Sequence, residues 1–258
     1  MSSPAITMKI VVLLVTVFFW NAASSIPSAN ADEISVGDFS SYKAGSPLPK
    51  SWEPLTFKGI EKHTRYSLVN DGASIVLRAE ADASASGLIR EVEIDPREYP
   101  LVQWRWKVTN ILEKGDVHRK SGDDYPARLY IAFELEFSKL SFFEKIKYRT
   151  AKLLYGRYPP AKVINYIWAN KAAKGTMVAN AFTEKAMMLV VESGGQKLNQ
   201  WVQQERNVYE DYKQAFGAEP PRISGVAIMT DTDNTGEAAK AYYGDILFKS
   251  DRLSSKGR

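Results

Sequence analysis

Two segments of this chain alternate apolar and polar residues, and this pattern constrains the fold more than any other feature. In residues 101–108 the apolar side chains include Trp104 and Trp106, with charged residues between them. Residues 129–137 repeat the pattern with Phe133 at their centre. Successive side chains of a β-strand point to opposite faces, so each segment is predicted to be a strand with one buried face.

Turn signals separate several further segments of this kind. Asn70, Asp71 and Gly72 form a strong hairpin signal, and the residues after them return to an apolar pattern. The further strands are predicted at residues 74–79, 163–168, 185–192, 201–208, 223–230 and 242–249. Short strands with one apolar face favour two packed antiparallel sheets. We therefore predict a mainly β fold, an antiparallel β-sandwich of jelly-roll type.

Two segments have helical spacing instead. Residues 138–155 place apolar side chains three to four apart with lysine and arginine between them, which predicts an inserted basic amphipathic helix. Such a helix covers one end of the sandwich or lies on an anionic membrane surface. Residues 209–216 are predicted to form a second, short helix that ends at Gly217.

The first 31 residues have the layout of a secretory signal peptide. Lys9 precedes an apolar run over residues 10–20, and residues 29–31 read Ala-Asn-Ala. Eleven residues give about 16 Å of helix, roughly half the thickness of a bilayer. We predict removal after Ala31, which leaves one domain over residues 32–258 in the periplasm or outside the cell. Retention as an N-terminal anchor is the alternative.

Charge and cysteine content exclude several classes of function. The net charge is +4, with 34 basic and 30 acidic residues, which is too balanced for a nucleic-acid-binding protein. The chain has no cysteine and two histidines. Disulfides, thiol catalysis and thiolate metal sites are therefore excluded, and a zinc site rich in nitrogen ligands is not expected.

The densest polar motif follows the strand predicted at residues 223–230. Asp231, Asp233 and Asn234 alternate with threonine before Gly236, as in loops that wrap a hard cation such as Ca²⁺. Tyr242 stands where a twelve-residue calcium loop needs a bidentate glutamate, so an EF-hand is rejected. A cation-binding or sugar-binding loop and a turn closed by its own side chains both fit.

A second acidic cluster stands at the entrance to the strand that begins near residue 129. Asp123 and Asp124 are adjacent carboxylates that repel one another, and Arg128 follows them. A cation, Arg128 or a ligand hydroxyl is expected to compensate this charge.

Two glutamates form a candidate catalytic pair. Glu134 and Glu136 lie two apart on one predicted strand, about 6.6 Å between their Cα atoms, a spacing that suits glycoside hydrolysis. Arg105 and Lys107 have the same spacing on another polar face. Cross-strand ion pairs to these two residues are the competing explanation.

Three residues are candidates for contact with a sugar. Trp168 and Asn170 end one predicted strand, and Trp201 follows a glycine-rich turn. An exposed tryptophan can stack on the apolar face of a sugar ring, while an amide binds its hydroxyls. Partial burial at a corner of the sandwich is the alternative.

Several motifs resemble those of an exported bacterial family catalogued as domain of unknown function 3047. They are residues 104–108 (WRWKV), 123–128 (DDYPAR), 166–170 (YIWAN), 206–212 (RNVYEDY) and 229–236 (MTDTDNTG). The resemblance covers nearly all of residues 38–248. It implies a single domain and carries no established activity.

A looser resemblance concerns both ends of the predicted domain. Residues 38–40 (DFS), 48–52 (LPKSW) and 243–248 (YGDILF) are similar to galactose-binding-type jelly-roll carbohydrate-binding modules. That resemblance implies paired first and last strands that share a structural Ca²⁺. Asp245 is then a candidate ligand, with Asp38 as its partner.

These observations favour an exported, non-enzymatic protein that binds a glycan or a cell-envelope polymer. A glycan-cleaving hydrolase that uses Glu134 and Glu136 is one alternative. An envelope protein that docks through residues 138–155 is another.

Overall fold

The computed structural model describes residues 32–135 and 161–251. The described residues belong to one compact unit, Asp32–Arg258. The predicted signal peptide and the predicted helix over residues 138–155 lie outside the described residues, and so does Glu136. No helix in the described part of the chain is long and apolar enough to cross a bilayer.

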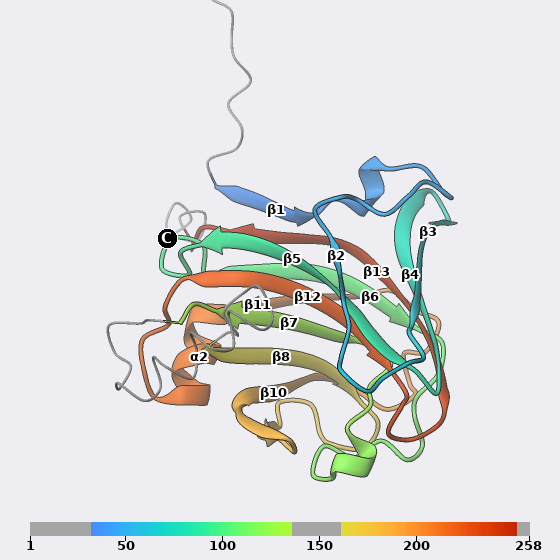
Figure 1. Ribbon diagram of the computed structural model, residues 1–258. Coiled ribbons are helices and arrows are strands. Elements are labelled where there is room, and N and C mark those ends of the chain that lie inside the picture. The colour runs from blue at the N-terminus through green and yellow to red at the C-terminus, as the bar shows by residue number, and fades with distance from the viewer. Residues whose placement is uncertain (1–31, 136–160, 252–258) are drawn as a thin grey trace, which may run out of the picture. The chain divides into compact units, whose positions relative to one another are not determined.

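Two β-sheets form the fold, which confirms the predicted mainly β sandwich. The six-stranded sheet contains β1 (Glu33–Gly37), β3 (Arg65–Asp71), β4 (Ser74–Asp82), β6 (Leu101–Val108), β11 (Val202–Asn207) and β13 (Ala238–Lys249). The seven-stranded sheet has the order β2 (Glu53–Leu55), β5 (Ala85–Ile94), β12 (Ile223–Asp231), β7 (Arg128–Phe133), β8 (Lys162–Ala169), β10 (Thr183–Ser193) and β9 (Met177–Asn180). Figure 1 shows β5, β12, β7, β8 and β10 following one another across this second sheet.

Most strand pairs are antiparallel, and the chain passes repeatedly between the sheets. The first and last strands pair, with Ile34 opposite Phe248, as the jelly-roll resemblance implies. One pair differs from the expected pattern, because β8 and β10 are parallel. β9 and β10 form an antiparallel hairpin, and its second strand, β10, runs beside β8 in the same direction as β8.

Aromatic side chains from both sheets fill the core. Trp104 lies 5.2 Å from Tyr166 between ring centroids, and Trp106 lies 6.2 Å from Trp168. These four residues come from β6 and β8, so they join the sheets directly. Their burial is complete or nearly so, as the alternation in residues 101–108 predicts.

The local signals for turns and caps act as expected. Gly72 has φ +62° in the hairpin between β3 and β4, a conformation that glycine adopts without strain. The predicted short helix is α2 (Val208–Phe216). The side chain of Asn207 accepts a hydrogen bond from the amide of Glu210, and Gly217 ends the helix with φ +64°.

One predicted strand is shorter than expected. The predicted strand covers residues 129–137, whereas β7 ends at Phe133. Phe133 is the last residue of β7 that pairs with β12, and its partner there is Ile223. Beyond this point the amide of Glu134 donates to the carbonyl of Arg222, outside the regular ladder. Glu134 is therefore placed at the end of a strand and not within it.

Close packing between β5 and β12 gives a prediction for Gly87→Ala. A Cβ atom at Gly87 would lie 2.8 Å from the carbonyl oxygen of Ile228, a distance at which the backbone must shift. We expect the free energy of unfolding in urea to fall by about 1–3 kcal/mol. The control is Gly225→Ala, where the nearest atom is 3.5 Å away, and it should leave stability unchanged or slightly raised. Equal losses in both variants would contradict this account.

Candidate functional site

Arg128, the first residue of β7, organises the site on the outer face of the seven-stranded sheet. Leu129, Ile131 and Phe133 point into the core, so the alternate residues Arg128 and Tyr130 point away from it. Arg128 is nevertheless only 3% exposed. A buried guanidinium needs partners for its charge and its donors, and the surrounding loops supply them.

Every nitrogen of this guanidinium has a partner. Nε donates to Oδ1 of Asp231 at 2.7 Å, and Nη2 donates to Oδ2 of the same carboxylate. Nη2 also donates to the carbonyl of Asp123, while Nη1 donates to the hydroxyl of Tyr130 at 3.1 Å. The Asp123 carboxylate lies 3.6 Å from Nη1. All three nitrogens of Arg128 thus donate to atoms of the protein itself.

The two charges of this pair affect each other strongly. Burial lowers the pKa of Arg128, but the charge of Asp231, together with Tyr130 and Asp123, outweighs burial, and the net effect raises that pKa. Burial raises the pKa of Asp231, and Arg128 opposes this effect. The charge of nearby Asp124 raises it further. The pair is held by mutual compensation, in a place where neither charge could stand alone.

The loop after β12 is fixed through Asp124. Its carboxylate accepts hydrogen bonds from the amide of Thr235 at 2.6 Å and from Nδ2 of Asn234 at 3.1 Å. One carboxylate oxygen from each of Asp124, Asp231 and Asp233 lies within 4.8 Å of the others. Burial raises the pKa of Asp233, and the charge of Asp124 raises it further. Negative charge therefore accumulates at this point beyond what Arg128 compensates.

The β9–β10 hairpin joins the site through Asn180. Its Nδ2 donates to Oδ2 of Asp123 at 2.7 Å, and its Oδ1 accepts from the amide of Phe182 at 3.0 Å. This turn presents the ring of Phe182 to solvent, 56% exposed. One asparagine thus ties an exposed aromatic ring to the buried carboxylates.

A second aromatic ring comes from the segment between β2 and β3. The amide of Ile60 donates to the carbonyl of Phe57, which closes a turn with Gly59 at φ +87°. That φ value is required at the third position of a type II turn and favours glycine. Phe57 is 39% exposed. Phe57 and Phe182 are the two large apolar residues that the described part of the chain exposes.

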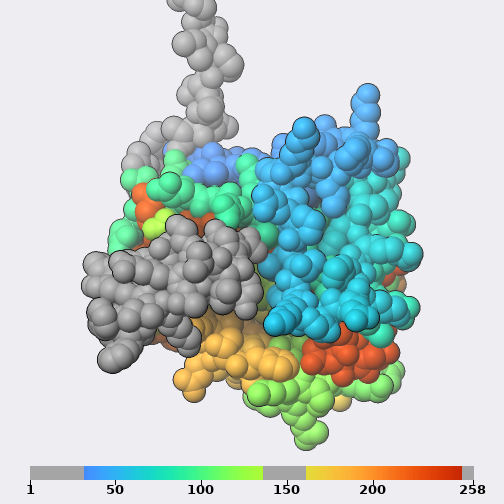
Figure 2. Space-filling model, viewed as in Figure 1, coloured from blue at the N-terminus to red at the C-terminus, as the bar shows by residue number. Residues whose placement is uncertain are grey.

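Both rings line a hollow of about 610 Å³ above the ion pair. We call it the Arg128 pocket, and its described lining is Phe57, Lys58, Ile60, Ala85, Asp123, Arg128, Tyr130, Asn165, Asn180, Phe182, Thr183, Ala186, Met229, Asp231, Asp233 and Asn234. In Figure 2 the blue segment after β2, the golden β9–β10 hairpin and the orange-red segment after β12 come together on this face.

Two residues of this lining carry buried oxygens without a hydrogen-bond donor among the described residues. They are Oδ1 of Asp123 and Oδ1 of Asn165. Both side chains are at least nine-tenths buried. A buried acceptor without a donor costs free energy, so both oxygens favour a ligand that brings donors.

The carboxylate cluster could hold a metal ion, since Asp124, Asp231 and Asp233 approach one another closely. Its fit is limited because Arg128 already occupies both oxygens of Asp231. The calcium ligands implied by the jelly-roll resemblance lie elsewhere. Both oxygens of Asp245 accept hydrogen bonds from Ser40, and a carboxylate oxygen of Asp38 accepts from Ser41. In this arrangement both residues serve local hydrogen bonds to neighbouring serines.

The structure brings together six of the residues predicted as ligand-binding, namely Asp123, Asp124, Arg128, Asp231, Asp233 and Asn234. The remaining three lie apart from the Arg128 pocket. Trp168 is 0% exposed in the core, where its Nε1 donates to the carbonyl of Gly194, so it has no face for a sugar. Asn170 donates to the carbonyl of Glu113.

Trp201, the third of these, lies beside the six-stranded sheet. Its Nε1 donates to Asp71 at 2.6 Å. The guanidinium of Arg105 and the ammonium of Lys107 lie 4.6 and 5.2 Å from its ring centre. Lys107 also forms an ion pair with Asp71 at 2.6 Å. Trp201 therefore serves a local cation–π arrangement on the opposite sheet.

This arrangement corrects the expected ion pairs of Glu134. Arg105 and Lys107 belong to β6, which neighbours β11 and β13, whereas Glu134 follows β7 in the other sheet. The expected cross-strand pairs to Arg105 and Lys107 are wrong for Glu134, because strand order places them on different sheets.

The pocket residues that sequence reasoning did not find include Phe57, Tyr130, Asn165, Asn180 and Phe182. Asn165 is a polar residue in an apolar strand, a local signal that could have marked it. Tyr130 shares the alternation of Arg128, which places both on one face. The two phenylalanines lie in turns that only the tertiary structure brings to the site.

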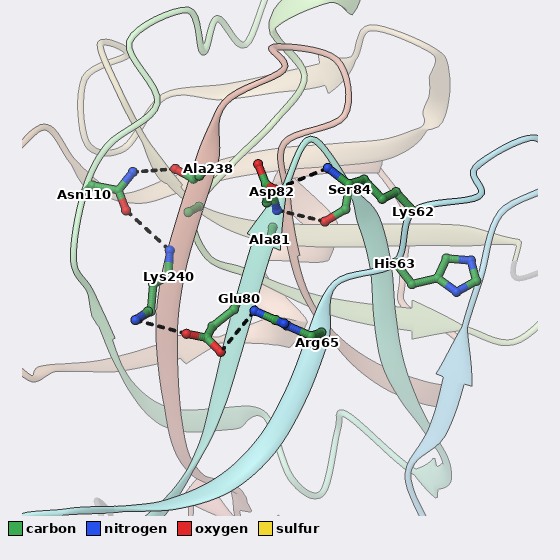
Figure 3. Close-up of a pocket in the computed structure, with 11 residues that line it drawn as sticks. Lys62, His63, Arg65, Glu80, Ala81, Asp82, Ser84, Asn110, Ala238 and Lys240 are labelled. Carbon is green, nitrogen blue, oxygen red and sulfur yellow. Dashed lines mark hydrogen bonds and ion pairs between the residues drawn. The ribbon is translucent and has the colours of Figure 1, made fainter.

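A second hollow, of about 550 Å³, lies near one end of β4 and β13 (Figure 3). Its charges are paired with one another, with Lys62–Asp82 at 3.2 Å and Lys240–Glu80 at 3.0 Å. Nδ2 of Asn110 donates to the carbonyl of Ala238 at 2.7 Å. None of the buried unpaired oxygens of the described residues lines this hollow. It therefore offers a ligand less than the Arg128 pocket does.

The fold and the site define a β-sandwich protein with an acidic, aromatic-rimmed pocket on one sheet face. Residues 50–247 match the sequence model of the family described as Protein of unknown function (DUF3047), and the chain belongs to this family. The family resemblance seen in the sequence is thereby confirmed. No curated protein matches the chain.

Several solved structures are similar to this one at low identity. An arabinose-bound α-L-arabinofuranosidase has a TM-score of 0.41 and 8% identity, over 84% of this chain and 26% of that chain. A variant of a family 29 carbohydrate-binding module has a TM-score of 0.34 and 9% identity, over 85% and 92%. The family 30 module of a Clostridium thermocellum cellulosomal cellulase has a TM-score of 0.37 and 9% identity, over 85% and 98%. The matched region thus spans about a quarter of the arabinofuranosidase.

Asp231→Asn tests the role of the buried ion pair. The substitution leaves the Arg128 guanidinium buried without its main countercharge, so we expect a loss of about 3–5 kcal/mol in the free energy of unfolding. The control is Asp82→Asn, which breaks a pair with Lys62 where the aspartate side chain is 82% exposed. This change should stay within about 1 kcal/mol. Similar losses in both variants would refute the structural role of Arg128.

Asp233→Asn tests the excess of negative charge through pH. A carboxyl whose pKa is raised in the folded protein loses its contribution to stability as the pH rises through that raised value. The variant should therefore be more stable than the wild type at neutral pH. The difference should vanish below about pH 3.9, the pKa of aspartate in an unfolded chain. Denaturant unfolding across this range measures it, and a constant difference would contradict the prediction.

Proposed function

We propose that the protein is an exported, non-enzymatic glycan-binding protein that holds a sugar of the cell envelope in the Arg128 pocket. The observation that carries this proposal is a pocket whose lining contains two buried acceptors without a hydrogen-bond donor among the described residues and whose rim carries two exposed aromatic rings. Sugars supply many hydroxyl donors together with an apolar ring face, so they complement both features.

The rim and the floor suit different parts of a sugar. Phe57 and Phe182 have no polar atoms on their rings, so they can stack on the apolar face of a pyranose. Asp233 and Asn234 lie at the mouth of the pocket, where Asp233 is half-buried and Asn234 is exposed. Their side-chain oxygens can accept hydrogen bonds from hydroxyls at the edge of the sugar ring. The volume of about 610 Å³ falls within the range of small-molecule sites.

The site offers little to an anionic ligand. Arg128 is the buried cation of the pocket, and its donors are already taken by Asp231, Tyr130 and Asp123. A phosphate or carboxylate would meet the surrounding aspartates instead. This argument favours a ligand that is neutral or positively charged.

Export is proposed from the sequence of residues 1–31, with its charged start, apolar run and Ala-Asn-Ala end. A periplasmic or secreted protein meets glycans and envelope polymers directly. This location agrees with a site whose groups suit hydroxyl-rich ligands.

Calcium belongs to the proposal as an alternative occupant of the Asp124–Asp231–Asp233 cluster. Ca²⁺ takes six to eight oxygen ligands, and Asp233 is the member of the cluster with the fewest protein hydrogen bonds. A cation there would link the loop after β12 to Asp124. Its effect would be a dependence of glycan binding on added calcium.

Retention of the purified protein on insoluble polysaccharides and peptidoglycan tests the proposed function. The wild type should be retained on at least one polymer, and Phe57→Ala with Phe182→Ala should weaken retention about tenfold or more. Both rings are exposed, so this double variant should keep its melting temperature. Trp201→Ala, on the opposite sheet, is the control and should bind normally.

The same assay separates the alternatives. Loss of binding in Trp201→Ala alone would move the site to the six-stranded sheet and refute the Arg128 pocket. Release of soluble sugar would contradict the non-enzymatic proposal and favour a hydrolase that uses Glu134 and Glu136. A comparison with and without calcium shows whether the acidic cluster needs a cation.

A further inference from the structure

We propose that the sugar bound in the Arg128 pocket carries a free amino group, as in a glucosamine polymer with unacylated amines. This inference rests on the proposed glycan-binding function and names the class of glycan. Three independent features of the pocket carry it: its charge, its hydrogen-bonding groups and its rim.

The pocket has more negative than positive charge. Asp123, Asp231 and Asp233 line it together with Lys58 and Arg128, and Asp124 lies within the same carboxylate cluster. Four carboxylates therefore face three cations, since the ammonium of Lys120 lies over the ring of Phe182. Lys58 and Lys120 are exposed, which leaves Arg128 as the buried countercharge. A neutral sugar leaves this excess uncompensated, whereas an ammonium group reduces it.

The free hydrogen-bonding capacity of the floor consists of acceptors. Oδ1 of Asp123 and Oδ1 of Asn165 have no donor among the described residues, although both residues are buried. Arg128 meets Oδ1 of Asp123 only as an ion pair at 3.6 Å, because its three nitrogens donate hydrogen bonds to Asp231, Tyr130 and the carbonyl of Asp123. An ammonium group brings three donors and no acceptor, which matches such a floor. An N-acetyl group brings one donor and an additional carbonyl acceptor, which does not.

The rim also accepts a positive charge. The ammonium of Lys120 lies 5.2 Å from the ring centre of Phe182, so this ring already carries a cation–π contact. An aromatic face of this kind also attracts the ammonium of a ligand, and Phe57 supplies a second exposed ring at the pocket. The rim therefore supports a cationic sugar as well as the stacking of its ring.

Three β-1,4-linked hexamers provide a matched set of probes, because they differ mainly at C2 of each ring. Cellohexaose carries a hydroxyl there, the N-acetylglucosamine hexamer an acetamide, and the glucosamine hexamer an amine. We expect calorimetric titration at low salt, with a chelator present, to give about tenfold or tighter binding for the amine. In 1 M salt the Debye length falls to about 3 Å, and most of this preference should disappear.

Asp233→Asn isolates the electrostatic contribution to binding of the amine, because it removes one charge from the mouth of the pocket and keeps the shape of the side chain. The variant should lose about tenfold in affinity for the glucosamine hexamer and little for the two neutral hexamers. Asp82→Asn removes the same charge from the opposite sheet, and it should bind all three hexamers like the wild type.

Each outcome decides between the two proposals. Equal binding of the three hexamers, or an unchanged preference in Asp233→Asn, overturns the amine while glycan binding stands. Tighter binding of a neutral hexamer overturns it as well. If the wild type is retained on no polysaccharide or peptidoglycan, the glycan-binding function itself fails, and the amine proposal fails with it.

Discussion

The buried pair of Arg128 and Asp231 is the interaction on which the site depends. It joins the start of β7 to the end of β12, and through the carbonyl of Asp123 it also holds the segment that leads into β7. Asn180 extends the same network to the β9–β10 hairpin. Removing either charge would leave the other buried without compensation, which is among the most costly changes a protein interior can undergo. Loops from three parts of the chain are therefore fixed in one arrangement before any ligand arrives.

The same pair explains why the pocket is acidic. One guanidinium suffices to hold the loops, yet the loops bring four carboxylates to it; burial raises the pKa values of Asp231 and Asp233, and the charge of Asp124 raises both further. A fold selected only for stability would avoid this excess, since asparagine at position 233 would preserve the shape without the repulsion. Local conflicts of this kind are expected at functional sites, where the cost is offset elsewhere in the fold. Here the sandwich core, with Trp104 and Trp106 fully packed, supplies that stability.

The sequence allowed the strands, the hairpin at Gly72 and the cap of α2 to be predicted, because these depend on neighbouring residues. It also indicated the acidic loops around Asp123 and Asp231, whose composition is unusual by itself. Strand order is a different matter, since it depends on the whole chain. The expected ion pairs of Glu134 were wrong for this reason, and Trp168 was indistinguishable from a surface aromatic until β8 was placed beneath β6. Phe57 and Phe182 carry no local signal, because only tertiary contacts bring their turns to one pocket.

The division of aromatic residues between core and rim has a consequence for specificity. Trp52, Trp104, Trp106 and Trp168 fill the interior together with several phenylalanines, while Phe57 and Phe182 form the exposed rim. A tryptophan at the rim would add an N–H donor to the pocket, whereas phenylalanine adds none. Under the proposed function, the rim would contribute attraction without selecting among hydroxyls, and the acceptors beneath it would make the selection. A ligand that stacks well but lacks donors leaves buried oxygens unpaired, and discrimination built on unpaired polar groups is far stronger than discrimination built on apolar contact.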